Sequence, residues 1–289
     1  MRVGGLRVDA ISDGAFVARP SYFGDRVPAT ARPDVFDRDG AAWLPIGCFL
    51  IRQERADPGA SAPVVLVDAG LGPALDPMPD GMMLVGGQLP TGLRAAGIHP
   101  AEVTDIVITH FHMDHVGWLF GTDEQPTFPN ARLWFGAGEW AHFVEGPGQM
   151  APHIRAGLRA RAGTPTLRPV DTEVCVAPGV RAVPAPGHTP GHLAVVVESR
   201  GERLILLGDA ITIPQQMAEE GWRSLGDVDA ARAEQSRQEL WALLSAPGAT
   251  GVGAHFPELR NGRVVSGEWS PVGGEPTSDP SCITRTGSR

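Results

Sequence analysis

A cluster of histidines that follows directly on a short apolar strand is the feature that most constrains this chain. Within six residues it places His110, His112, Asp114 and His115. In an extended segment, residues i and i+2 point the same way, so His110 and His112 can converge on one ion. A sharp turn after them then directs Asp114 and His115 toward a second ion. Neutral imidazole and carboxylate suit Zn²⁺, and also Fe or Mn, better than Ca²⁺ or Mg²⁺, so the cluster predicts a transition-metal site.

Three later motifs each place a ligand-type side chain just past the end of an expected strand. His188 stands in a turn stiffened by Gly and Pro, and Asp209 follows an apolar strand that ends in Gly208. His255 ends a short strand of small residues. Loops at strand ends gather on a rigid scaffold, which is where binding and catalytic residues concentrate. These three residues are therefore candidates to complete the metal site.

The order HxHxDH, GHTPGH, GD and a late His, spread over residues 66–255, resembles the metallo-beta-lactamase superfamily. This resemblance implies an α/β chain folded as an αββα sandwich, in which two mixed β-sheets are flanked by helices. It also implies two bound ions, expected to be Zn²⁺, with Fe or Mn as alternatives. The first ion would be held by His110, His112 and His188, and the second by Asp114, His115 and His255, with Asp209 bridging them.

The same resemblance implies hydrolytic chemistry. A hydroxide between the two ions would attack the substrate carbonyl, and Asp114 and Asp209 would act as catalytic residues that orient this nucleophile and relay a proton. Short stretches such as those around Asp13 and Trp118 are similar to the lactonase and methyl parathion hydrolase-like branch. We therefore expect a hydrolase that opens a lactone or cleaves a small ester. Thioesterase, phosphotriesterase and beta-lactamase-like hydrolases, or a diiron oxygenase of the same fold, stay open as alternatives.

The chain departs from the lactonase pattern at one position. Lactonases commonly carry a Tyr three residues after the bridging Asp, where it binds the substrate carbonyl, and this chain has Thr212 there. The only Tyr is Tyr22, so Tyr22 and Thr212 are the candidates to replace it. The expected substrate contacts are Tyr22, Phe23, Trp118 and Thr212. The residues expected to support the metal loops by hydrogen bonds are Asp68 and His192.

Three segments fall outside the scaffold pattern and are expected to build the substrate pocket: residues 19–45, 73–90 and 138–163. The first is rich in aromatic residues and is expected to form a lid with little secondary structure. The second carries three Met residues, which suit an adaptable apolar wall. The third reads as two helical pieces with a break around residues 146–148. A tail over about residues 267–289 is expected to be flexible.

Apolar periodicity predicts the regular elements of the scaffold. Helices are expected over residues 89–97 and 229–245, because a Gly ends the first and Pro and Gly follow the second. The expected strands cover residues 6–11, 47–52, 64–68, 105–109, 132–135, 180–184, 192–197 and 204–207.

Composition limits the classes of partner. The 289 residues, 42% of them hydrophobic, can bury a full core, and we expect a single domain over residues 1–289. A net charge of −9 without a run of Lys or Arg argues against nucleic acid. No apolar stretch reaches about 18 residues and the start lacks a signal-peptide core, so we expect no membrane contact and a cytoplasmic protein. The expected partner is a small-molecule substrate, and a homodimer stays open.

Overall fold

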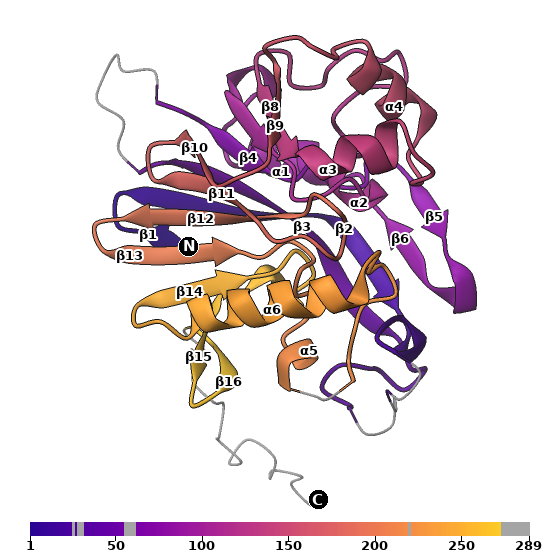
Figure 1. The fold of residues 1–289 in the computed structure, drawn as a ribbon, viewed down its shortest axis with the longest axis vertical. Coiled ribbons are helices and arrows are strands. Elements are labelled where there is room, and N and C mark those ends of the chain that lie inside the picture. Colours follow the sequence, from indigo (N-terminus) through magenta and orange to yellow (C-terminus); the bar gives the residue numbers. More distant parts are fainter. Residues whose placement is uncertain (25–26, 28–31, 55–61, 219–220, 273–289) are drawn as a thin grey trace, which may run out of the picture.

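Two mixed β-sheets pack face to face and form the body of the molecule (Figure 1). The computed structural model describes residues 1–24, 27, 32–54, 62–218 and 221–272. In the first sheet the strand order is β5-β6-β2-β3-β4-β7-β8-β9, with β1 paired to β2. Its strands are β1 (Arg2–Val3), β2 (Leu6–Ala18), β3 (Ala42–Gln53), β4 (Val65–Val67), β5 (Leu75–Pro77), β6 (Met83–Val85), β7 (Asp105–Val107), β8 (Arg132–Gly136) and β9 (Leu167–Val170).

The second sheet has the strand order β10-β11-β12-β13-β14-β15-β16. In each sheet the strands that precede the predicted metal loops include a parallel pair, β4 with β7 and β13 with β14. Parallel strands bring their carboxyl ends to one edge of the sheet, so the loops that follow β7, β13 and β14 start from such edges. The strands are β10 (Val174–Ala177), β11 (Val180–Pro184), β12 (Leu193–Ser199), β13 (Glu202–Leu206), β14 (Ala249–Val252), β15 (Gly262–Val265) and β16 (Glu268–Pro271).

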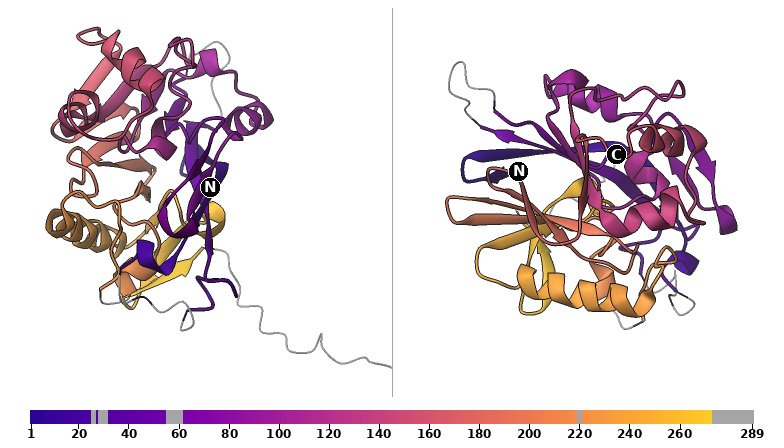
Figure 2. Two further views of the ribbon diagram at one scale, coloured as in Figure 1. Left: turned by 90° about the vertical axis from the view of Figure 1, so that its right-hand side faces the viewer. Right: turned by 45° about the horizontal axis from the view of Figure 1, so that its top comes forward.

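Helices cover the outer faces of the two sheets. The helix α1 contacts β2 of the first sheet, and α6 contacts β14 and β15 of the second. Figure 2 shows these two helices on opposite sides of the sandwich, so the expected αββα architecture is confirmed. No helix in the described part of the chain is both long and apolar enough to cross a membrane. The helices are α1 (Leu89–Ala95), α2 (Met113–Val116), α3 (Ala137–Glu139), α4 (Pro152–Arg159), α5 (Gln215–Ala218) and α6 (Ala230–Leu244).

The strand β3 shows why the sheets hold together, because it is buried on both faces. Phe49 and Ile51 belong to the core between the two sheets, which also contains Val195 of β12. The alternate residues Cys48 and Leu50 pack on the other side, in a core shared with α1. Successive side chains of a strand point to opposite faces, so an uninterrupted apolar run produces a strand covered on both sides.

The first expected insertion contains less loop than its composition indicates. β2 continues to Ala18 and β3 begins at Ala42, so the last residues of the insertion are strand. Leu44 is buried in the core while Trp43 is 66% exposed, which is the alternation of a half-buried strand. The neighbouring Pro45 hid this pattern, because Pro is uncommon inside strands. Residues 25–26 and 28–31 of this insertion lie outside the described residues.

The second insertion is a β-hairpin rather than a loop. β5 and β6 pair antiparallel and extend the first sheet beside β2. Strand alternation then separates its Met residues: Met82 is buried in the core, Met83 lies opposite Val17 in the sheet, and Met78 reaches the cavity described below. The prediction that the Met residues of this segment form an apolar wall of the pocket is therefore wrong, except for Met78.

The third insertion and the C-terminal segment had different outcomes. The two expected helical pieces are present: α3 continues into a π-helical turn over Trp140–Val144, and α4 follows after a break. The expectation of a flexible segment from about residue 267 is wrong for the strand β16, which pairs with β15. Trp269 of β16 packs edge to face on Phe256, and this contact holds the strand. Residues 273–289 lie outside the described residues.

Candidate metal centre

The predicted ligand residues converge at one end of the sandwich. Their nitrogen and oxygen atoms form three overlapping groups, and within each group all the atoms lie within 4.8 Å of one another. The groups share His110 and His115, so they adjoin rather than stand apart. One group holds three histidines, one holds two histidines and Asp209, and one holds Asp114 with two histidines; the residues brought together are His110, His112, Asp114, His115, His188, Asp209 and His255.

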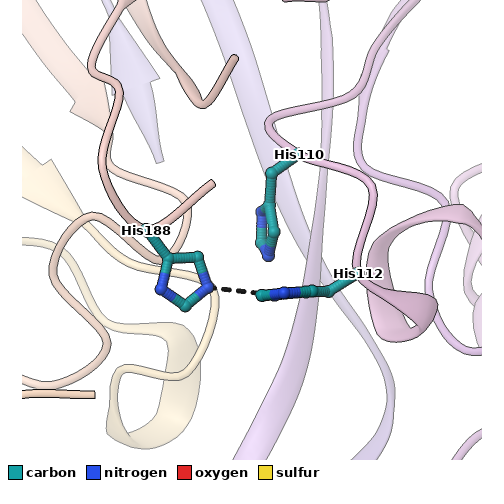
Figure 3. A group of neighbouring side chains, drawn as sticks. All are labelled: His110, His112 and His188. Carbon is teal, nitrogen blue, oxygen red and sulfur yellow. Dashed lines mark hydrogen bonds between the residues drawn. The ribbon is translucent and has the colours of Figure 1, made fainter. Parts of the chain in front are cut away.

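The three-histidine group joins the two sheets (Figure 3). His110 and His112 come from the loop after β7, and His188 comes from the loop between β11 and β12. The Nδ1 atom of His112 and the Nε2 atom of His188 lie 3.1 Å apart, and the ring of His110 points toward the gap between them. Extended backbone at His112, directly before α2, gives the two loop histidines the common direction that the i, i+2 spacing predicts.

The other two groups share His115, and together they form one second group around the carboxylates of Asp114 and Asp209. The Nε2 atom of His255 lies 3.1 Å from Asp209 Oδ2 and 3.4 Å from Asp114 Oδ2. The Nε2 atom of His115 lies 3.5 Å from Asp209 Oδ1. Asp209 also comes within 3.8 Å of His188 Nε2, so its carboxylate stands between the two groups. This is the position that a bridging ligand needs.

Hydrogen bonds from the outer ring nitrogens fix how three of the histidines face the centre. His115 Nδ1 donates to Asp68 Oδ2 over 2.9 Å, and His255 Nδ1 donates to the carbonyl oxygen of Pro45 over 2.7 Å. His188 Nδ1 donates to Asp227 Oδ1 over 3.0 Å. A neutral imidazole has one donor and one acceptor nitrogen, so in the neutral form of each ring, which metal binding requires, such a bond assigns the lone pair to Nε2.

The two groups have opposite protonation in the metal-free protein. Burial, together with the neighbouring His115, holds the pKa of His110 well below its usual value, and burial with His188 lowers the pKa of His112 to about 3. Burial also disfavours the charged form of His115, but Asp68 and Asp114 outweigh it and raise its pKa to about 9. Against the same burial, the two carboxylates raise the pKa of His255 well above its usual value. His110 and His112 are therefore neutral, whereas His115 and His255 hold protons.

A cavity of about 210 Å³ opens onto the centre. Its other walls are mainly apolar and include Phe16, Leu84 and Leu225. No Lys or Arg belongs to its described lining, so the charged groups that face it are the carboxylates Asp114 and Asp209 and the protonated His255. The predicted ligands that line the cavity are His112, Asp114, Asp209 and His255.

Of the four residues expected to contact substrate, only Tyr22 lines this cavity. Phe23 is fully buried behind the Tyr22 ring, where it packs against an aromatic cluster. Trp118 donates its indole N–H to Asp13 and packs on the core beside α1. Thr212 is fully buried, and its backbone N–H donates to Gln216. The prediction that these three side chains contact substrate is therefore not supported, because each points into packing outside the cavity.

The two residues expected to support the metal loops make hydrogen bonds there. Asp68 accepts from the backbone and hydroxyl of Thr109 as well as from His115. Its φ of 62° is a left-handed conformation that costs a non-Gly residue energy, and these bonds hold it there. His192 Nε2 accepts from the backbone N–H of Asp209 over 3.1 Å, which positions the loop that carries that carboxylate.

Sequence reasoning assigned no role to two buried acids that hold the loops in place. Glu139 accepts from the backbone N–H groups of Phe111 and Gly191, each over 2.7 Å, and so joins the loop after β7 to the loop before β12. Asp227, which orients His188, also pairs with the buried Arg237 of α6. An acid directly after a strand was the available signal for Glu139. Nothing in the sequence around Asp227 distinguishes it from an ordinary loop acid.

Asp13 organises the loops beside the centre in a similar way. Its carboxylate accepts from the backbone N–H groups of Leu71 over 2.8 Å and Leu89 over 2.7 Å, and from the Trp118 indole. Gly70 lies so close that an added Cβ would sit 2.4 Å from the Asp13 carboxylate, so only Gly fits there. Asp13, whose surroundings resemble the lactonase branch, therefore holds the neighbouring loops together by hydrogen bonds and does not belong to the candidate ligand groups.

Known proteins that are similar to this chain in sequence include a probable metallo-hydrolase and an N-acyl homoserine lactonase. A probable metallo-hydrolase of Mycobacterium tuberculosis is 31% identical over 171 residues, which is 51% of this chain and 53% of that protein. An N-acyl homoserine lactonase of Bacillus cereus is 25% identical over 178 residues, or 57% of this chain and 62% of that enzyme. The chain thus spans between about half and two thirds of the length of these relatives.

The fold also matches solved structures, and a family description covers most of the chain. The dizinc quorum-quenching lactonase AidC, in complex with a product, superposes with a TM-score of 0.79 over 94% of this chain and 96% of AidC, at 24% identity. At that identity the likeness shows a shared fold. The description of the metallo-beta-lactamase superfamily matches residues 43–255, a span that includes all the predicted ligands. The chain therefore belongs to the metallo-beta-lactamase superfamily.

Proposed function

We propose that this chain is a dinuclear metal-dependent hydrolase that opens a lactone or cleaves a small ester. The observation that supports it best is the convergence of seven ligand side chains into overlapping groups beneath an apolar cavity. The N-acyl homoserine lactonases among its relatives favour a lactone over other esters.

The residues present fit two transition-metal ions. His110 Nε2, His115 Nε2 and Asp209 Oδ1 are buried and have no hydrogen-bond partner in the described part of the chain. A buried polar atom left without a partner costs about 1–3 kcal/mol, so three in one place indicate a missing ligand. The donor set of imidazole nitrogen and carboxylate oxygen suits zinc, with iron or manganese as alternatives. The first ion would take His110, His112 and His188, the second would take Asp114, His115 and His255, and Asp209 would contact both.

Two divalent ions bound there would lower the pKa of water toward neutrality and polarise a carbonyl oxygen. The chain supplies the carboxylates that orient the attacking water. His255 and His115 overcome the effect of burial and hold the pKa of Asp209 below its usual range, so this carboxylate stays an acceptor. In the reaction the water oxygen bonds to the carbonyl carbon, the bond to the leaving oxygen breaks, and a water proton passes by way of Asp114 Oδ2 to the leaving oxygen.

The cavity favours a neutral substrate. Its described lining has apolar side chains, two carboxylates and no Lys or Arg to pair with an anion. A carboxylate or phosphodiester on a part of the substrate remote from the metal centre would find no Lys or Arg in the described lining to pair with it. We therefore place small neutral lactones and esters before beta-lactams and nucleic acids.

A substrate panel combined with elemental analysis tests this function. The protein should contain about two ions per chain, mainly zinc, and should cleave lactones or small esters faster than thioesters, phosphotriesters and beta-lactams. A chain that takes up two ions and cleaves none of these classes, or that carries iron and consumes oxygen, would contradict the proposal. Colorimetric metal release and proton-release assays measure both quantities on one preparation.

A further inference from the structure

We propose that the hydroxyl of Tyr22, held in position by Ser224, is the protein's hydrogen-bond donor to the carbonyl oxygen of the substrate. This inference rests on the hydrolase function proposed above and adds a positioned donor to it. The chain has no Tyr in the loop after Asp209, where the resembling lactonases carry theirs. Tyr22 would fill that role from a segment of the first sheet.

Tyr22 stands in the right place for this contact. It lies in the single 3-10 turn Pro20–Tyr22 after β2, and it lines the same cavity as Asp114, Asp209 and His255. Its ring makes edge-to-face contacts with Phe16 at 4.8 Å and with Phe23 at 5.1 Å between ring centroids. A buried ring packed on two sides keeps its orientation, so the hydroxyl has a defined position in the cavity.

The direction of the hydrogen bonds leaves the phenol proton available. The Ser224 hydroxyl donates to the Tyr22 oxygen over 2.9 Å, and Ser224 Oγ in turn accepts from the backbone N–H of Gly226 over 3.2 Å. Among the hydrogen bonds of the described residues, none has the Tyr22 hydroxyl as its donor. A Tyr hydroxyl is both donor and acceptor, so with its acceptor side used by Ser224 the proton can point to an oxygen in the cavity.

The backbone ties this pair to the metal centre. The N–H of Leu225 donates to the Tyr22 carbonyl oxygen over 2.8 Å, so the two segments run side by side. Two residues further along, Asp227 holds His188, and the N–H of Val228 donates to the His188 carbonyl oxygen over 3.0 Å. One short loop therefore sets both the Tyr22 hydroxyl and a ligand of the first ion. This connection ties the position of Tyr22 to that of His188.

Thr212 is the rival for the same role, and its surroundings argue against it. Its side chain is fully buried and does not belong to the cavity lining. Its loop is held by Gln216, whose side-chain oxygen accepts from the backbone N–H of Thr212 over 2.6 Å. Its hydroxyl is buried without a hydrogen-bond partner among the described residues and does not open onto the cavity that would receive the substrate.

The experiment compares hydroxyl deletions on the full chain loaded with zinc. The variants are Tyr22→Phe, Ser224→Ala and Thr212→Val, and Ser245→Ala serves as the control because its hydroxyl bonds a carbonyl of α6 far along the helix. Rates are measured on whichever of N-hexanoyl-L-homoserine lactone, γ-decalactone and p-nitrophenyl acetate the wild type cleaves fastest. Zinc content and thermal unfolding are measured for every variant, and calorimetry gives the affinity for the lactam analogue of N-hexanoyl-L-homoserine lactone.

Tyr22→Phe should lower kcat by about 10- to 100-fold, with KM changed much less, because a donor to the developing oxyanion acts mainly in the transition state. Ser224→Ala should lower kcat by a smaller factor, since the donor remains but is no longer oriented. Both variants should keep wild-type zinc content, and Tyr22→Phe should weaken lactam binding by a few-fold. Ser245→Ala and the wild type should agree.

Two failures are distinguishable. A wild-type chain that holds two zinc ions and cleaves none of the three substrates contradicts the proposed function, and the inference fails with it. A wild-type chain that cleaves one of them while Tyr22→Phe stays within two-fold in kcat and in lactam affinity contradicts the inference alone. A loss in Thr212→Val without a loss in Tyr22→Phe would assign the donor to Thr212 instead.

Discussion

The two halves of the candidate centre lie side by side, but their buried histidines differ in protonation. In the three-histidine half, His110 and His112 stay neutral, because burial and neighbouring imidazoles lower their pKa values. In the half that contains the carboxylates, protonated His115 and His255 balance the negative charge. Their pKa values are raised by Asp68, Asp114 and Asp209. An ion entering the first half meets the neutral rings of His110 and His112, whereas an ion entering the second half must displace the protons of His115 and His255.

The supports of the two halves differ as well. His188 in the first half depends on Asp227, which is itself neutralised by Arg237 of α6. In the second half, His115 depends on Asp68 at the end of β4, and His255 depends on a carbonyl of β3. Substitutions in the loop before α6 should therefore affect the first half, and substitutions in the first sheet should affect the second half. This difference makes the two halves separable by substitution.

The largest expected effect belongs to the one residue that both halves share. Asp209→Ala should lower turnover by several orders of magnitude, because Asp209 lies within 3.8 Å of ligand nitrogens in both groups. The fold should persist, since the side chain is at a strand end and not in the core. Steady-state rates and circular dichroism on the same sample measure the two effects.

Asp171→Ala, an exposed acid in the turn between β9 and β10, is the matched control and should behave as wild type. Near-wild-type turnover from Asp209→Ala would mean that the two halves do not act together through this carboxylate.

The second expected effect is the loss of one ion from one half. We expect about two ions per wild-type chain, and about one in His112→Ala and in His255→Ala, because each variant removes a ligand from a different group. Elemental analysis after removal of free metal gives the ratio directly. His99→Ala, an exposed histidine at the start of a 3-10 turn, should retain both ions. A wild-type ratio of one, not raised by reconstitution, would remove the distinction between the halves.

The convergence of the candidate ligand residues could be predicted because each belongs to a short motif at the end of an apolar strand. The supports could not, since they lie far from the ligand in sequence. Asp227 is 39 residues from His188, and Glu139 is 28 residues from Phe111, whose N–H it accepts. Each acid reaches its partner only because the sandwich brings two loops together. Spacing within a motif carries no information about such a partner.

The fold could be predicted at the level of its layers but less well at its edges. The apolar runs that form β4, β7, β11, β12 and β13 are buried between layers, so their composition identifies them. The strands β9, β10, β15 and β16 have only four residues each and are partly exposed, so their apolar patterns are too short to identify them. The hairpin β5–β6 was hidden by Pro and Gly, because turn-forming residues dominate a segment in which only three residues per strand pair.

A smaller effect should follow from substituting the supports instead of the ligands. Asp227→Asn should weaken the ion of the first half, and Asp68→Asn the ion of the second, each by about 10- to 100-fold, because the partner of a ligand histidine fixes its orientation and basicity. Competition with a chromophoric chelator measures the two affinities separately. Asp171→Asn controls for the loss of a negative charge. Equal losses at both ions in either variant would show that the halves share their supports.

The smallest expected effect is a pH dependence that distinguishes the halves without any substitution. In the metal-free protein, His112 has its pKa lowered to about 3, so as pH falls below 6.5 the unfolded chain takes up a proton that the folded chain refuses, and stability falls. His115 has its pKa raised to about 9, so as pH rises from 6.5 toward 9 the folded chain holds a proton that the unfolded chain has lost, and stability falls again.

The metal-free protein should therefore be most stable near pH 6.5, the usual value from which both pKa shifts depart. Loading with zinc should remove the alkaline loss, because an ion that replaces the proton on His115 leaves nothing to titrate there. Urea unfolding of chelator-treated and zinc-loaded samples at pH 5, 6.5 and 9 measures both slopes. Without zinc, His115→Gln should have a smaller alkaline slope than the wild type, because only the contribution of His255 remains. An alkaline loss of equal size in the loaded protein would show that His115 is not a ligand.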